Sequence, residues 1–322
     1  MCSTMITGLL PESFSLSLAA SSSPLYVNSN TSLILTFTLS DTISKSDYFQ
    51  LVLPANSSFT FIGISSSNLG LFPSATTYVA ANNTLVMRQS SSSSTKSAGT
   101  VCQITVGRYT APGSTKTTSA FLLQIYNSYN GLKMQGSATV TAVAKAYAVT
   151  VVAGSYLINQ NTSYSFVVNV TDSLLSSAMI QVRFPAELAV SVAANCLTNN
   201  NFSSTTTAAC TTPAANTVLV GNITSAAVTP GVYSISIATV TNANRALTTS
   251  GFSLVIYYSD DTTAQVGTSS VGAVTMLSRE LAASAISVVE TDSTVSASGV
   301  TMNVSFVALD YANGYITITI PA

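Results

Sequence analysis

The sequence predicts an all-β protein, built from antiparallel two-sheet sandwiches that repeat in tandem. Three observations support this prediction. Long stretches alternate apolar and polar residues, as strands with one buried face do. A block of sequence recurs in one register with a period of about 131 residues. Ser, Thr, Asn, Ala and Val are abundant, which favours strands and turns over helices.

The repeated block is clearest in three segments of equal length. Residues 30–55 read NTSLILTFTLSDTISKSDYFQLVLPA, residues 161–186 read NTSYSFVVNVTDSLLSSAMIQVRFPA, and residues 297–322 read ASGVTMNVSFVALDYANGYITITIPA. The offset is 131 between the first two copies and 136 between the last two. Residues 101–128 and 232–259 share the offset of 131, with eleven identities in 28 positions. A fixed period of this kind marks an array of similar domains.

Strand parity agrees between the copies, which is the physical test of the alignment. The inward positions of the first expected strand are Leu33, Leu35 and Phe37, then Tyr164, Phe166 and Val168, then Val300, Met302 and Val304. Those of the second are Phe49, Leu51 and Leu53, then Ile180, Val182 and Phe184, then Ile316, Ile318 and Ile320. Further strands are expected at 102–106 and 121–125 and at their matches, 233–237 and 252–256. We expect about seven strands per unit and no helix.

This pattern resembles the immunoglobulin-like and fibronectin-III-like domains strung along large extracellular surface and fibre proteins. The resemblance covers the whole chain in strand pattern and tandem period. The core Trp and the inter-sheet Cys pair of antibody domains are absent, and a unit of about 131 residues exceeds the usual ~100. The resemblance implies an enlarged Ig-like sandwich.

The ends of the chain set the expected domain limits. Residues 1–16 have no expected partner strands and resemble the stretch near 273–289, so they predict the end of a preceding repeat or a linking strand. Ig-like repeats are then expected at 17–147 and 148–283, and an incomplete third repeat at 284–322. Either the chain is a window on a longer polypeptide, or a neighbouring copy completes the last unit by strand addition.

Charge is scarce, which excludes several classes of function. Charged residues are 7% of the chain, the net charge is −1, and neither His nor Trp occurs. No basic patch predicts nucleic-acid binding, and no apolar run approaches the roughly 18 residues of a membrane span. With so little charge, solubility is expected to depend on attached glycan or on burial of the surface in an assembly.

Sequons for N-linked glycan are the most frequent motif, and they predict a secreted or cell-surface protein. They begin at Asn30, Asn56, Asn82, Asn161, Asn169, Asn201, Asn222 and Asn303. Asn30 and Asn161 occupy the same repeat position, and Asn169 and Asn303 have outward parity. The runs at 90–95 and 203–207 are expected to be exposed loops, either bearing O-linked sugar or unmodified.

Four cysteines suggest one disulfide. Cys196 and Cys210 flank a loop of the second unit that has no cysteines in the first, so a bridge closing this loop is predicted. Cys102 has inward parity and is expected to be a buried thiol, with a Cys2–Cys102 bridge as the alternative.

No catalytic residue and no cofactor is expected. Without His there is no Ser-His-Asp or Cys-His arrangement and no zinc site. Asp41 and Asp172 recur at one repeat position, where a carboxylate capping a turn explains them. The acidic pairs Asp260-Asp261 and Glu290/Asp292 lie near unit junctions, where either calcium or solvated turns are possible readings.

The leading hypothesis is therefore a structural protein. It would be an extracellular, glycosylated array of sandwiches that forms or decorates a surface fibre, with copies of itself or adjoining repeats as partners. An adhesin-type binding module using its variable loops is the alternative. A carbohydrate-active enzyme is the remote alternative.

Overall fold

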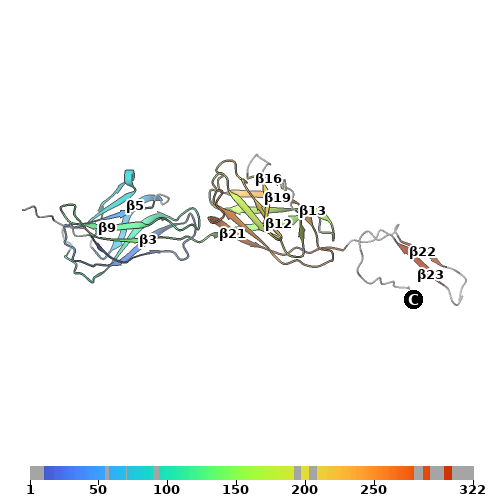
Figure 1. The fold of residues 1–322 in the computed structure, drawn as a ribbon, viewed down its shortest axis with the longest axis horizontal. Coiled ribbons are helices and arrows are strands. Elements are labelled where there is room, and N and C mark those ends of the chain that lie inside the picture. The colour runs from blue at the N-terminus through green and yellow to red at the C-terminus, as the bar shows by residue number, and fades with distance from the viewer. Residues whose placement is uncertain are drawn as a thin grey trace, which may run out of the picture.

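The computed structural model describes residues 11–54, 58–69, 71–89, 94–191, 197–202, 209–278, 286–290 and 301–306. These residues form two β-sandwiches, followed by a separate pair of strands (Figure 1). A single 3₁₀ turn, Ala80–Asn82, is the one helical element among them. None of the described helices is long and apolar enough to cross a membrane. The expected all-β class is confirmed.

The first sandwich packs a 4-stranded sheet on a 6-stranded one. The 4-stranded sheet has the order β2 (Leu16–Ala20), β3 (Asn30–Thr38), β8 (Val101–Thr110) and β5 (Ser58–Ser67). The 6-stranded sheet has the order β1 (Glu12–Ser13), β10 (Leu132–Ala138), β9 (Phe121–Tyr126), β4 (Tyr48–Val52), β7 (Thr84–Gln89) and β6 (Leu71–Val79).

The second sandwich repeats this arrangement. One sheet has the order β12 (Ala148–Ala153), β13 (Asn161–Val170), β19 (Gly231–Thr241) and β15 (Ala189–Val190), and β16 (Leu197–Asn200) also pairs with β19. The other has the order β11 (Lys145–Ala146), β21 (Gln265–Val271), β20 (Phe252–Tyr257), β14 (Met179–Arg183), β18 (Thr217–Val220) and β17 (Cys210–Ala214). Each sandwich therefore has more strands than the seven expected from the sequence.

The sheet orders are those of an immunoglobulin-like domain. Strands β2-β3-β8-β5 correspond to the A-B-E-D sheet, and β10-β9-β4, widened by β7 and β6, to the G-F-C sheet. The short strand β1 runs parallel to β10 at the edge of its sheet, as β11 does to β21 in the second sandwich, whereas the other strand pairs of the two sandwiches are antiparallel. One connection is unusual: β5, which takes the D position, precedes the two added strands β6 and β7 in the chain.

The two sandwiches also share their residue register. Phe37 pairs with Cys102 in the first, and Val168 pairs with Tyr233 in the second, each 131 positions further on. In the opposite sheets Leu51 pairs with Leu123, and Val182 with Leu254, at the same offset. The alternation seen in the sequence therefore corresponds to the same residue pairing in both sandwiches.

The core of each sandwich is made of the inward positions expected from strand parity. In the first they include Leu33, Leu35, Phe37, Phe49, Leu51, Ile104 and Leu123, all at most 2% exposed. In the second they include Tyr164, Phe166, Val168, Ile180, Val182, Ile235 and Leu254, all fully buried. Four aromatic rings meet in the second core, where Phe166 packs edge-on against Phe184 and Phe252 at 5.7 Å. The predicted parity is confirmed.

One of the two expectations for the start of the chain, the end of a preceding repeat, is not met by the described residues. Residues 12–16 do not belong to a preceding repeat, because β1 pairs with β10 and Leu16 opens β2. Phe14 explains the difference: its ring packs 5.0 Å from Phe37 and lies against Gly136, where a Cβ would come within 2.5 Å of it. In the same way the second sandwich begins at Lys145, slightly before the expected limit of 148. Residues 1–10 lie outside the described part.

The last two strands match the opening of a third unit. β22 (Ile286–Glu290) pairs antiparallel with β23 (Met302–Phe306), and Val288 faces Val304. Val304 aligns with Phe37 and Val168, which pair in the same way with Leu16 and Val149. These strands therefore reproduce the β2–β3 and β12–β13 pairs. The predicted strand at 315–320 lies outside the described residues.

Because the two sandwiches have separate cores, we predict that a mutation in one core destabilises that sandwich alone. Phe166→Ala should lower the free energy of unfolding of the second sandwich by about 3–5 kcal/mol, because it removes a fully buried ring and leaves a cavity. The first sandwich should keep its stability. Hydrogen exchange followed by mass spectrometry reads both sandwiches in one experiment. Val152→Ala, at a half-exposed position of β12, is the control. If Phe166→Ala lowered the free energy of unfolding equally in both sandwiches, the cores would not be separate.

Candidate functional site

Several of the described acidic side chains, among them Asp41, Asp47, Asp172 and Glu187, hold turns or pair with lysines. No group of three or more His, Cys, Asp or Glu side chains within the described ranges is placed to hold a metal ion. Glu187, for example, accepts hydrogen bonds from the backbone N–H and the hydroxyl of Ser250, both at 3.0 Å. Hydrogen bonds from its own backbone N–H and from that of Ser250 lower the pKa of the Glu187 carboxyl. Of the acidic residues near the last unit junction, Glu290 ends β22 and Asp292 lies outside the described residues.

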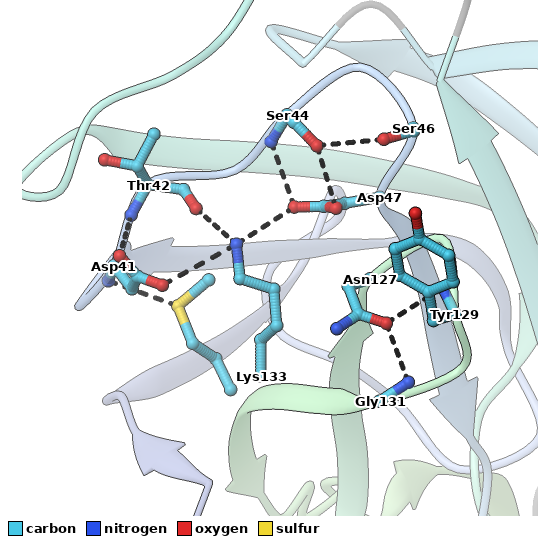
Figure 2. Close-up of polar contacts among 10 residues, drawn as sticks. Asp41, Thr42, Ser44, Ser46, Asp47, Asn127, Tyr129, Gly131 and Lys133 are labelled. Atoms are coloured by element: carbon cyan, nitrogen blue, oxygen red, sulfur yellow. Dashed lines mark hydrogen bonds and ion pairs between the residues drawn. The ribbon is translucent and has the colours of Figure 1, made fainter.

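Lys133 ties the turn between β3 and β4 to strand β10 at one end of the first sandwich (Figure 2). Its Nζ donates to the Thr42 carbonyl at 2.6 Å and to Asp47 Oδ2 at 3.1 Å, and lies 3.6 Å from Asp41 Oδ2. Asp47 is 3% exposed and also accepts two hydrogen bonds from Ser44, each at 2.9 Å. The buried carboxylate is therefore both paired and hydrogen-bonded, as burial of a charge requires.

The second sandwich uses the recurring aspartate differently. Asp172 pairs with Lys145 of β11 at 2.7 Å, whereas Asp41 faces Lys133 of β10. The predicted turn contact of Asp41 is present, since the Thr42 N–H donates to it at 2.6 Å. The lysine partners could not be predicted from the sequence, because Lys133 and Lys145 are remote from these aspartates in the chain and occupy unrelated repeat positions.

The turn between β9 and β10 completes this end of the first sandwich. Asn127 Oδ1 accepts from the backbone N–H groups of Tyr129, at 2.9 Å, and Gly131, at 2.8 Å (Figure 2). The turn is held so that the Tyr129 side chain projects into solvent, 91% exposed. This end therefore presents an exposed aromatic ring beside the Asp41–Lys133 pair.

The corresponding end of the second sandwich receives the first sandwich. Thr115 donates its backbone N–H to the Gln265 carbonyl at 2.9 Å, and its hydroxyl accepts from the Gln265 N–H at 3.1 Å. Lys116 Nζ lies 3.0 Å from Asp261 Oδ2. Gly113 packs on Tyr258 so closely that a Cβ there would lie 2.9 Å from the ring. We call these six residues the junction.

Thr263 sets the charge state of the junction. Its hydroxyl and its backbone N–H both donate to Asp261 Oδ1, at 2.6 and 2.9 Å. These hydrogen bonds, with a smaller contribution from Lys116, lower the pKa of Asp261 to about 2. Because the folded pKa lies below the ordinary value of 3.8, mainly through Thr263, the charged form stabilises the turn at 261–263 above about pH 4. That contribution is lost as the pH falls towards 2.

The linker between the sandwiches is hydrogen-bonded on both sides. Val143 donates its N–H to the Leu25 carbonyl at 2.7 Å and accepts from the Val27 N–H at 3.0 Å. A few residues later, Tyr147 donates its N–H to the Thr268 carbonyl of the second sandwich at 3.1 Å. The linker is thus part of both sandwiches, which limits bending between them.

The exit from the second sandwich is built like the exit from the first. Leu277 donates to the Tyr156 carbonyl at 2.8 Å and accepts from the Ile158 N–H at 3.1 Å, as Val143 does with Leu25 and Val27. The hydroxyls of Thr248 and Thr275 contact each other at 3.1 Å, as those of Thr117 and Thr141 do at 2.7 Å in the first sandwich. The geometry that leads out of one sandwich into the next is therefore present twice.

The sequon asparagines lie at the surface. Those within the described residues are all exposed: Asn30, Asn82, Asn161, Asn169, Asn201, Asn222 and Asn303. By contrast, Asn200 and Asn242, which do not begin sequons, are buried at 5% and 3% exposure. Asn56 and most of the two loops considered for O-linked sugar lie outside the described part. Occupancy by glycan stays a prediction.

The cysteines are placed as follows. Cys102 is a free thiol with no exposed surface, so the alternative Cys2–Cys102 bridge is wrong and the buried thiol is the correct reading. Burial raises the pKa of the Cys102 thiol to about 11, although Lys96 opposes the shift. Cys210 begins β17 and is buried. Cys196 lies outside the described residues, as does Cys2, so the Cys196–Cys210 bridge stays a prediction.

Comparison with known proteins adds little. No family model matches the chain, and no curated protein matches it. Solved structures that align with the chain include the C-terminal domain of the Streptococcus pyogenes antigen I/II-family protein AspA, at 7% identity and TM-score 0.29, covering 82% of this chain and 99% of that one. The Enterococcus faecalis adhesin ACE, described as binding its ligands by the collagen Hug model, aligns at 11% identity and TM-score 0.25 over 82% and 96%.

A type II cohesin dyad from the scaffoldin ScaA of Acetivibrio cellulolyticus aligns at 9% identity and TM-score 0.22 over 78% and 89%. Alignments with such low identities and TM-scores do not define the function of this chain. The class of the protein is therefore defined by its own topology: a tandem array of Ig-like sandwiches.

The Lys133 cluster generates a stability prediction. Lys133→Met should lower the free energy of unfolding of the first sandwich by about 2 kcal/mol, because it removes charged hydrogen bonds to the buried Asp47. Chemical denaturation measures the change. Lys45→Met, an exposed lysine of the same turn, is the matched control and should change stability by less than about 0.5 kcal/mol. Equal effects of the two variants would refute the anchoring role.

The junction generates a prediction about orientation. Lys116→Glu places two negative charges together and should broaden the distribution of angles between the sandwiches, measured by small-angle X-ray scattering. Each sandwich should keep its own unfolding midpoint, because the Lys116 side chain is 68% exposed. Adding Asp261→Lys restores the ion pair in reverse and should restore the narrow distribution. If the double variant stays as broad as the single one, the pair does not orient the sandwiches.

Proposed function

We propose that this chain is a structural element of an extracellular fibre or surface layer, in which Ig-like sandwiches are joined head to tail and covered by N-linked glycan. The single observation that carries the proposal is the junction. Backbone hydrogen bonds, a close glycine contact and an ion pair join one sandwich to the next, and the exit geometry recurs after the second sandwich.

The mechanism of such an array is mechanical. Each sandwich is a stiff segment because its core is closed on both sheets. A hydrogen-bonded linker lets force and orientation pass from one sandwich to the next with little hinge motion. The junction joins two different ends, and a contact between unlike ends leaves a free end of each kind for further units.

Glycan explains how such a surface stays soluble. Only 7% of the residues are charged, and the sequon asparagines within the described residues are exposed on both sandwiches. Sugar attached there would supply the hydration that charge supplies in other proteins. These sequons support an extracellular location, since N-linked glycan is attached in the secretory pathway.

Expression of the chain in a secreting eukaryotic host tests the proposal. Intact mass spectrometry before and after peptide N-glycosidase should show sugar on several sequons, and Asn169→Gln should remove one glycan from the mass. Electron micrographs of the native material should show beaded rods or fibres. Asn200→Gln is the control and should leave the mass of glycan unchanged. Unglycosylated protein, together with only free compact particles, would overturn the proposal.

Ligand binding is a second candidate function, favoured by one specific observation. The second sandwich has a recess of about 570 Å³ beside Pro185, with Arg183 at its wall. The array and the recess rest on different residues, so each function is tested separately.

A further inference from the structure

The recess lies at the strand ends of the six-stranded sheet of the second sandwich, where β14 and β21 end and β20 begins. Its lining combines one guanidinium with hydroxyl groups, an amide and small side chains, and its main contributors are Arg183, Ala186, Asn216, Ser250, Ser253 and Ser270. A volume of about 570 Å³ falls in the range of small-molecule sites and holds one or two sugar rings.

Arg183 is the only charged residue in this lining. It ends β14 and is exposed, with Thr217 of β18 on one side and Ser253 of β20 on the other. Ser253 in turn pairs with Ser270 of β21. A single row across the sheet therefore sets hydroxyl groups beside the guanidinium.

The Arg183 charge is available to a ligand. Throughout the described part of the chain, the ion pairs are made by Lys116, Lys133 and Lys145, and none involves Arg183. The nearby carboxylate of Glu187 is held by Ser250, which accounts for both of its oxygens. In a protein with so few charges, an unpaired guanidinium in a recess is a specific feature.

The walls of the recess are fixed by backbone contacts. Gly251 approaches the Val271 carbonyl so closely that a Cβ would lie 2.8 Å from its oxygen, so no side chain occupies that space. Asn216 adopts the left-handed conformation at φ 52°, and its amide donates to the Pro185 carbonyl at 3.4 Å. A site with fixed walls loses little entropy when a ligand binds.

We propose that this recess binds a sugar ring that bears a carboxylate. The Arg183 guanidinium presents paired N–H donors that match the two oxygens of a carboxylate. The row of serine hydroxyls and the Asn216 amide match the hydroxyl groups of a sugar, and Pro185 and Ala186 offer a small apolar surface to its C–H face. Uronic acids and nonulosonic acids share this chemistry.

The first sandwich provides an internal comparison. Val52 occupies the position of Arg183, since it pairs with Thr84 and Leu122 as Arg183 pairs with Thr217 and Ser253. The corresponding place in the first sandwich therefore lacks the guanidinium. Binding is expected in the second sandwich alone.

The test is titration of the full chain, followed by ¹H–¹⁵N NMR and calorimetry, with glucuronate, N-acetylneuraminate, methyl glucuronate ester, glucose and acetate as probes. At least one of the two acidic sugars should bind with a Kd on the order of 1 mM, as one ion pair and a few hydrogen bonds allow. The shifted amides should lie around Arg183 and Ser253. The neutral ester and glucose show whether binding needs the carboxylate charge. Acetate shows whether binding needs the sugar ring.

Variants locate the site. Arg183→Gln should weaken binding at least about tenfold, and Arg183→Lys by about threefold to tenfold, because lysine keeps the charge without the paired donors. Arg245→Gln, an exposed arginine of the same sandwich outside the recess, is the matched control and should bind as the parent does. Unfolding midpoints of the variants show that each is folded.

Three results would overturn the proposal. They are binding of neither acidic sugar, binding of acetate as tight as that of the sugars, and binding unchanged by Arg183→Gln. Binding of glucuronate but not N-acetylneuraminate, or the reverse, would support the proposal and identify the source of the carboxylate. None of these results depends on whether the chain forms fibres.

Discussion

The antiparallel pairing of β3 with β8, repeated by β13 with β19, is the constraint on which the rest of the structure depends. It sets Leu35 opposite Ile104, and Phe166 opposite Ile235, with all four side chains fully buried. A shift of one residue along this ladder would turn each inward side chain to solvent. Because this pairing fixes where each strand begins and ends, it also fixes the positions of the turns at the strand ends and of the linker between the sandwiches.

Charge is used in this protein to join elements that are remote in the chain. Lys133 holds the turn between β3 and β4 to β10, Lys145 holds Asp172 to β11, and Lys116 reaches Asp261 in the next sandwich. The first two pairs are partly buried, where water screens them weakly, while the third is more exposed. The charged side chains in these pairs therefore fix the positions of turns, of a strand and of the neighbouring sandwich.

The two ends of a sandwich have different roles. One end presents the turn between β9 and β10, and its counterpart in the second sandwich receives the loop at 113–116. The other end presents that loop and the start of the linker. A contact between unlike ends has no internal symmetry to close it, so the same design can extend over many units. The recess around Arg183 shares no residue with the junction, and its lining residues Ser250 and Val271 lie close in the chain to the exit from the second sandwich.

Strand parity and the period of about 131 residues were enough to predict the all-β class, the inward faces of the main strands and the outward position of Asn169 and Asn303. These properties follow from local alternation and repetition, which are visible in one chain. The sequence did not show that residues 12–16 belong to the first sandwich, because the parallel pairing of β1 with β10 joins segments more than a hundred residues apart.

Only the tertiary structure decided which side chains meet. Asp41 and Asp172 occupy one repeat position, yet they face lysines from different strands. Arg183 reads in the sequence as one more outward residue of a strand. Its place in a recess comes from Gly251, Asn216 and Ser270, which lie on other strands and turns. Sequence alternation determines which face a residue lies on, and packing between distant segments determines its neighbours.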